Sequence, residues 1–190
     1  GLVEEMDGLT EAAVQGRLDA RGNAAQFGGG YARIVQGMND TLDAVIGPLN
    51  VAAEYVDRIS KGDIPEKIVD DYQGDFNEIK NNLNACIDGL GGLVEANAVL
   101  QRMAENDYTE QVEGRYQGVF AEVGQAVNEV QDRLVHIQGT ALNIAAGDLS
   151  DLEAYKAIGG GAGRRSENDQ MVPAFIEMME ALEGLVVEAD

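Results

Sequence analysis

The sequence predicts an all-α protein whose long helices pair with a second copy of the same chain. Apolar residues recur at alternating steps of three and four, the spacing of a coiled-coil seam. A motif recurs at intervals of 45 and 44 residues, which indicates repeated units. Only 5% of the residues are aromatic, and the rest of the apolar content is aliphatic. Together these features favour helices packed on helices.

The helices follow in order along the chain, separated by connectors that hold most of the glycines. We expect helices near residues 2–15, 31–61, 75–105, 119–146 and 169–188. The first four should each end at a residue suited to the left-handed conformation, because Gly and Asn adopt it readily. These residues are Gly16, Gly62, Asn106 and Gly147. The run Gly159–Gly163 lacks the Gly-Lys-Ser/Thr of a phosphate-binding loop and is expected to be a flexible connector.

The repeat has a fixed internal spacing. Gly29, Gly74 and Gly118 are each followed ten residues later by an asparagine, and an aspartate lies four residues beyond it. The asparagines are Asn39, Asn84 and Asn128. A looser fourth copy begins at Gly147. The predicted units are therefore 1–46, 47–92, 93–134 and 135–190, the last divergent and with a long glycine-rich connector. Each long helix then belongs to two consecutive units.

The seam predicts the oligomeric state. From Phe120 to Ile144 the apolar residues step by three and four without a break. The steps from Ile34 to Leu42 and from Ile79 to Ile87 are four and four, a stutter that locally unwinds a supercoil. Two helices and a connector cannot bury such a seam alone. A parallel homodimer with a four-helix bundle at each unit would do so.

Composition excludes several functions. The chain has 190 residues and a net charge of −21, which disfavours nucleic-acid binding and anionic membranes. One cysteine and one histidine cannot supply a zinc tetrad, and a lone cysteine makes no internal disulfide. A catalytic triad around His136 is formally allowed, but no other pattern points to it. We expect no enzyme activity, no cofactor, no metal and no small-molecule substrate.

Localisation is predicted from segments that are missing. The longest uncharged run, Ala44–Ala53, is about half the length of a membrane span, and no signal peptide precedes the first helix. The chain starts at Gly1 without Met, so we expect a piece of a longer protein. A cytoplasmic segment is predicted, and membrane anchoring of the parent protein is left open.

These residues resemble HAMP domains, the two-helix signal relays of bacterial receptors. In that family a glycine ends the first helix, and apolar residues follow two and about six positions later. The matching sets are Gly62, Ile64 and Ile68; Asn106, Tyr108 and Val112; Gly147, Leu149 and Leu152; and Gly16 with Leu18, where Gly22 replaces the second apolar residue. The sequences of residues 31–48 and 59–68 also resemble those of linked HAMP arrays in methyl-accepting chemotaxis proteins.

The resemblance implies a parallel homodimeric coiled-coil rod of four linked HAMP units. It implies an intramolecular relay that passes helix rotation or packing changes from an input module to a kinase-control module downstream in the same chain. The alternatives are the HAMP array of a sensor histidine kinase and a passive coiled-coil spacer. An acidic residue often opens the second helix in the family; Asp75 fits, Glu167 or Asp169 could serve in the fourth unit, and the first offers only Gly30-Tyr31.

The residues expected to carry signalling or packing are those of the connectors and of the seam flank. They are Gly16, Leu18, Pro48, Gly62, Ile64, Ile68, Tyr108, Val112, Gly147, Leu149, Leu152, Asn39, Asn84 and Asn128. For the asparagines, two interpretations stay open: a tolerated polar flank, or a half-buried side chain that fixes register. His136 is expected at the seam edge, and Cys86 as a reduced, half-buried thiol.

Overall fold

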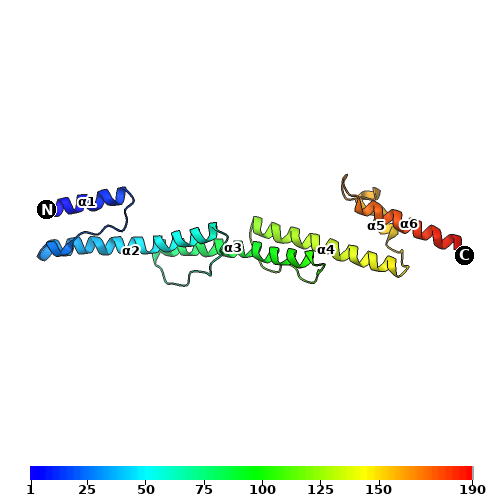
Figure 1. Ribbon diagram of the computed structural model, residues 1–190, viewed down its shortest axis with the longest axis horizontal. Helices are drawn as coiled ribbons and strands as arrows, with labels where there is room; N and C mark the ends of the chain where they lie inside the picture. The colour runs from blue at the N-terminus through cyan, green and yellow to red at the C-terminus, as the bar shows by residue number, and fades with distance from the viewer. Residues whose placement is uncertain (190) are drawn as a thin grey trace. The chain divides into compact units, whose positions relative to one another are not determined.

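The computed structural model describes residues 1–189, and these form helices and connectors with no strand (Figure 1). The elements are α1 (Leu2–Val14), a short 3-10 helix η1 (Ala24–Gln26), α2 (Gly29–Ser60), α3 (Gly74–Ala104), α4 (Val119–Ala145), α5 (Leu152–Gly161) and α6 (Met171–Ala189). The predicted all-helical class is therefore confirmed. The chain divides within α3 into two compact parts, an N-terminal half (Gly1–Gly91) and a C-terminal half (Gly92–Asp190).

The predicted helices agree with the observed ones to within about two residues at each end, which is the usual uncertainty of helix boundaries. The short η1 and the helix α5 were not predicted. No helix was expected at residues 152–161 because of the glycine run that begins at Gly159. Residues 152–157, however, include good helix formers. The backbone leaves helical geometry only at Ile158, Gly159 and Gly160. The residues just before the expected flexible connector, Gly159–Gly163, therefore form a helix.

The four helix ends that precede connectors share one geometry, as predicted. Gly16, Gly62 and Gly147 have φ of 77°, 80° and 82°, and Asn106 has φ of 61°. At the second end, the N–H of Asp63 donates to the carbonyl of Arg58 at 3.0 Å. The corresponding bond recurs at 2.8 to 3.0 Å at the other three ends. This is the left-handed cap that satisfies otherwise unpaired carbonyls.

In the N-terminal half, α1 lies alongside the first part of α2, with the first connector between them (Figure 1). Val35 and Asn39 of α2 are buried against the first connector, and Ile46 is buried farther along the helix. The predicted seam lies on another face of α2. Ile34, Met38, Val45, Leu49 and Val56 are between 41% and 56% exposed. In a single chain these five seam residues of α2 are therefore exposed, while Leu42, Ala52 and Ile59 are half-buried.

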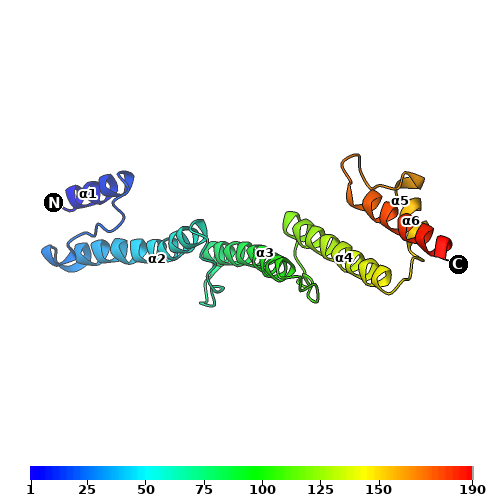
Figure 2. The ribbon, with the colours of Figure 1, turned by 45° about the vertical axis from the view of Figure 1, so that its right-hand side comes forward.

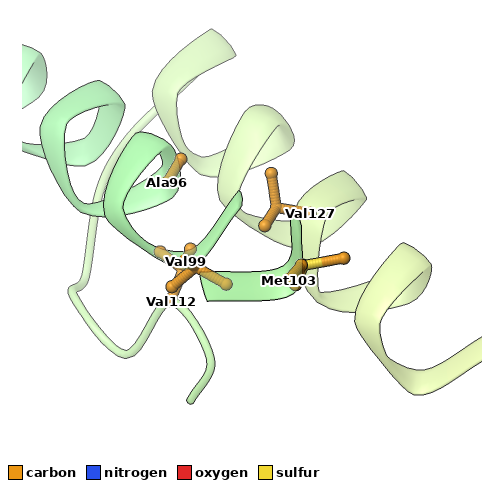
Figure 3. Packing of buried hydrophobic residues seen from close by; sticks show 5 residues of the cluster. All are labelled: Ala96, Val99, Met103, Val112 and Val127. Atoms are coloured by element: carbon orange, nitrogen blue, oxygen red, sulfur yellow. The ribbon is translucent and has the colours of Figure 1, made fainter. Parts of the chain in front are cut away.

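The C-terminal half has two hydrophobic clusters. The first joins α3 to α4 through Val112, a connector residue (Figure 3). Its buried members are Ala96, Val99, Met103, Val112 and Val127. The second cluster joins α5 to α6, which lie side by side in both views of the ribbon (Figure 2). Its buried members are Leu152, Tyr155, Val172 and Met179. The connectors are thus part of the cores and not loose loops.

Within the part of the chain described, no helix combines the length and the apolar character needed to cross a membrane.

Candidate functional site

The three repeated asparagines each grip one connector residue with both ends of the side-chain amide. Asn84 Oδ1 accepts from the backbone N–H of Ile68 at 2.8 Å, and its Nδ2 donates to the Ile68 carbonyl at 3.0 Å. Asn128 makes the same pair with Val112, at 2.8 and 2.9 Å. Asn39 makes it with Gly22, at 2.9 and 2.8 Å. We call this arrangement the asparagine clamp.

The clamp has a simple physical cause. Each clamped residue belongs to a non-helical connector, where the backbone has no neighbouring strand or helical turn to satisfy its polar groups. The amide of Asn offers one acceptor and one donor at the spacing of a peptide group. Asn39 is only 8% exposed, so an unpaired amide there would be costly. The structure gives the asparagines a contact that neither interpretation included, because each one faces the connector of its own chain.

A second contact repeats beside each clamp. The residue before the clamped one reaches an aspartate that lies one helical turn after the asparagine. The pairs are Arg21 with Asp43 at 2.6 Å, Lys67 with Asp88 at 2.6 Å, and Gln111 with Asp132 at 2.8 Å. The recurrence of these aspartates is visible in the sequence, and their partners are not. Exposed pairs of this kind contribute about 0–1 kcal/mol, so they orient more than they stabilise.

The predicted apolar anchors lie where the clamps hold them. Ile68 and Val112 are buried, while Ile64 and Tyr108 are half-buried. Ile68 lines a small crevice of about 10 Å³ together with Pro48 of α2, the proline expected to matter for packing. Leu18 is 41% exposed and so is the weakest of the predicted anchors.

The glycine in the first connector has a packing reason. Gly22 is buried, and a Cβ added to it would lie 2.7 Å from Cγ1 of Val35 on α2. In the third connector the large residue is on the connector and the small one on the helix. Val112 faces Gly124 of α4, and a Cβ added to Gly124 would lie 3.0 Å from Val112 Cγ1. One of each facing pair is small, so both connectors approach the second helix closely. Gly22 stands where the second apolar residue of the HAMP pattern is expected, and Val35 of α2 packs against it in place of that side chain.

The fourth connector is held differently. One repeat of 44 residues after Asn128 and Asp132 the sequence has Val172 and Ile176. The fourth connector therefore has neither the asparagine clamp nor the aspartate contact. Leu149 is half-buried, and Leu152, predicted as a connector anchor, is buried at the start of α5. Asp169 accepts from the N–H groups of Met171 and Val172 and so caps α6, as an opening acid would.

The lone histidine and cysteine have no shared site. His136 is exposed, and its ring stacks on Tyr155 with a centroid separation of 5.7 Å. Cys86 is exposed, which corrects the expected half-buried thiol. Residues 1–189 contain no group of three or more His, Cys, Asp or Glu side chains that could hold a metal ion.

A hollow of about 680 Å³ lies within the C-terminal half. Its walls include the seam residues Val130, Leu134 and Ile137 of α4, with Tyr155 and Phe175 opposite them. Because seam residues form one wall, the hollow can be read in two ways: as a ligand pocket, or as a packing surface that nothing in the single chain covers.

Comparison with known proteins identifies part of the chain. Residues 26–92 match the family profile of the HAMP domain. No curated protein and no solved structure matches the chain. The matched residues include the second connector, with Ile64 and Ile68, and the clamp residue Asn84. A HAMP domain is a signal-relay module of transducer proteins, so residues 26–92 belong to a relay of that kind.

Replacing Asn84 by Ala should weaken the fold, because the N–H and carbonyl of Ile68 would lose both partners. The expected cost is about 1–3 kcal/mol in the free energy of unfolding, measured by urea titration. The matched control is Asn82→Ala, since Asn82 is exposed on the same helix and has no partner among the described residues. Equal effects of the two substitutions would contradict the clamp.

Proposed function

We propose that the chain is an intramolecular signal relay made of four linked HAMP-like units, at residues 1–46, 47–92, 93–134 and 135–190. The match of residues 26–92 to the HAMP domain carries the proposal. The asparagine clamp supports its extension, because the contact of Asn84 with Ile68 recurs with near-identical spacing outside residues 26–92: Asn39 grips Gly22, and Asn128 grips Val112. The fourth unit rests on the shared cap at Gly147 alone.

The proposal includes a parallel homodimer, with a four-helix bundle of two chains at each unit. The uncovered seam of α2 supports it, because apolar side chains in register along a long helix need a covering surface. The hollow beside Val130, Leu134 and Ile137 supports it at the junction of the third and fourth units. A partner chain with the same seam would cover both, and a parallel arrangement brings like residues to the same height. Linked bundles of this kind form a coiled-coil rod.

The mechanism we propose is a choice between two packings of each four-helix unit, which differ in helix rotation or tightness. Connectors bias that choice, because their anchors insert into the bundle while the clamp fixes them to the second helix. Burying one anchor such as Ile68 is worth about 1.5–3 kcal/mol, similar to a typical allosteric coupling of about 1–3 kcal/mol. Helices shared by consecutive units pass the bias along, and stutters let neighbouring units prefer different packings.

The wider context is also a proposal. The resemblance to chemotaxis receptors supports a cytoplasmic relay to a kinase-control module in the same chain, with no catalytic role, cofactor, small-molecule substrate or nucleic-acid partner. The array of a sensor histidine kinase is the second candidate, since such kinases carry the same units. A passive spacer is the third. Three clamped connectors disfavour it, because an uninterrupted helix would serve a spacer better.

Dimerisation is tested through Cys86. In the parallel dimer the two Cys86 residues lie at the same height close to seam residue Ile87, so mild oxidation should link two chains in most of the sample. The control is the variant Ala85→Cys with Cys86→Ser, because successive helical residues are about 100° apart and Ala85 faces away from the seam. That variant should link poorly. A monomeric mass at micromolar concentration, or equal linking of both, would overturn the dimer.

Relay is tested through the anchors. Replacing Ile64 or Ile68 by Asn in a receptor that carries this segment should shift the signalling output, because the connector then favours another packing. The dimer mass should persist, since the seam is unchanged. The control is Val69→Asn, because Val69 is 86% exposed beside Ile68. Unchanged output in both anchor variants would favour the passive spacer.

A further inference from the structure

A carboxylate on α3 ties the third connector to the first helix of its unit. Glu95 accepts hydrogen bonds from the N–H of Glu113 at 2.8 Å and of Gly114 at 3.2 Å. The hydroxyl of Tyr116 donates to the same carboxylate at 2.6 Å. These donors, the Tyr116 hydroxyl first, lower the pKa of Glu95 from its ordinary value of 4.5, so the group is charged at neutral pH. Hydrogen bonds to a charged acceptor are the stronger kind.

The first connector has the same tie. Glu5 of α1 accepts from the N–H of Asn23 at 2.7 Å and from the side-chain amide of Gln26 at 2.8 Å. In both cases the acid precedes the donating backbone residue by 18 positions, and that residue directly follows the clamped one. Two connectors 90 residues apart in sequence thus carry the same contact, which makes an accidental pairing improbable.

The fourth connector is tied to its first helix with the polarity reversed. Thr140 Oγ1 of α4 donates to the connector carboxylate of Asp151 at 2.9 Å, and Asn143 Nδ2 donates to it at 3.2 Å. The acid now lies in the connector and the donors in the helix. The mechanical result is the same link between the connector and the helix before it.

The second connector lacks such a tie. By the repeat, the position of Glu5 and Glu95 falls at Val51 of α2, 18 residues before Val69, and Val51 is not acidic. Within residues 1–189 the backbone N–H groups of Val69 and Asp70 have no protein acceptor. The ion pair of Arg58 with Asp63 joins the very start of this connector to α2, as Arg102 with Asp107 does in the third. Beyond it, α2 contacts the connector through apolar side chains.

We propose that Glu5 and Glu95 are positioning residues that fix the first and third connectors to both helices of their units. The second connector, whose polar contacts beyond Asp63 all go to α3, is the adjustable one. The inference rests on the proposed relay, because it says that the connectors of the relay differ in stiffness. A doubly fixed connector must move with both helices. The second connector can follow α3 while α2 rotates or shifts against it.

The test is amide hydrogen exchange on the full chain at neutral pH. Glu95→Ala should speed exchange of the Glu113 and Gly114 amides about tenfold, the factor that corresponds to one hydrogen bond to a charged group. Glu95→Gln, which keeps an acceptor oxygen, should restore part of the protection. The control Asn97→Ala changes an exposed residue of the same helix and should leave both amides unchanged.

The converse variant adds a tie. Val51→Glu should slow exchange of the Val69 or Asp70 amide severalfold, and Val51→Gln less, because its acceptor is uncharged. Unchanged exchange in Glu95→Ala, or equally fast exchange of the wild-type third and second connectors, would overturn the positioning role. If the chain is a dimer but either of these exchange results is found, the relay proposal stands and the positioning role of Glu5 and Glu95 is wrong. If the chain is a monomer but Glu95→Ala still speeds exchange of the Glu113 and Gly114 amides, the positioning role stands and the relay proposal is wrong.

Discussion

The bidentate hydrogen bond between an asparagine amide and a connector peptide group is the contact on which the rest of the structure depends. A connector of about a dozen residues between two parallel helices has no regular partner for its backbone. By satisfying one peptide group at its middle, Asn39, Asn84 and Asn128 fix where the connector crosses the second helix. Everything nearby follows from that point: the anchor faces inward, the preceding residue reaches an aspartate, and the next residue meets the carboxylate of Glu5 or Glu95.

The clamp also explains why each long helix has two working faces. Buried positions such as Val35 and Asn39 face the first connector of the same chain, so they cannot serve the seam. The seam residues of α2 are displaced around the helix and remain exposed. In the proposed dimer, one face of the helix packs on its own connector and a second chain covers the other. Intrachain clamps and interchain pairing are therefore complementary parts of one arrangement in the proposed dimer.

The helices and their left-handed ends were predictable, because seam periodicity and the Gly or Asn after it are local signals. The role of the asparagines was not, since the sequence shows that Asn84 repeats but not that it faces Ile68. Gly22 seemed a defect until Val35 was found against it. The helix α5 was missed because Gly159 and its neighbours outweighed the residues before them. Glu5 and Glu95 were hidden among 34 acidic residues, although their equal distance from the helix ends at Gly16 and Asn106 was a usable signal.

The most direct measurement is the exchange rate of individual connector amides in the wild-type chain. If the clamp organises each connector, the amides of Gly22, Ile68 and Val112 should exchange far more slowly than the amides of exposed connector residues such as Asp19, Glu66 and Glu110. All three should be protected to a similar degree, because the same pair of hydrogen bonds holds each. Exchange of these three amides at the rate of their exposed neighbours would contradict the account.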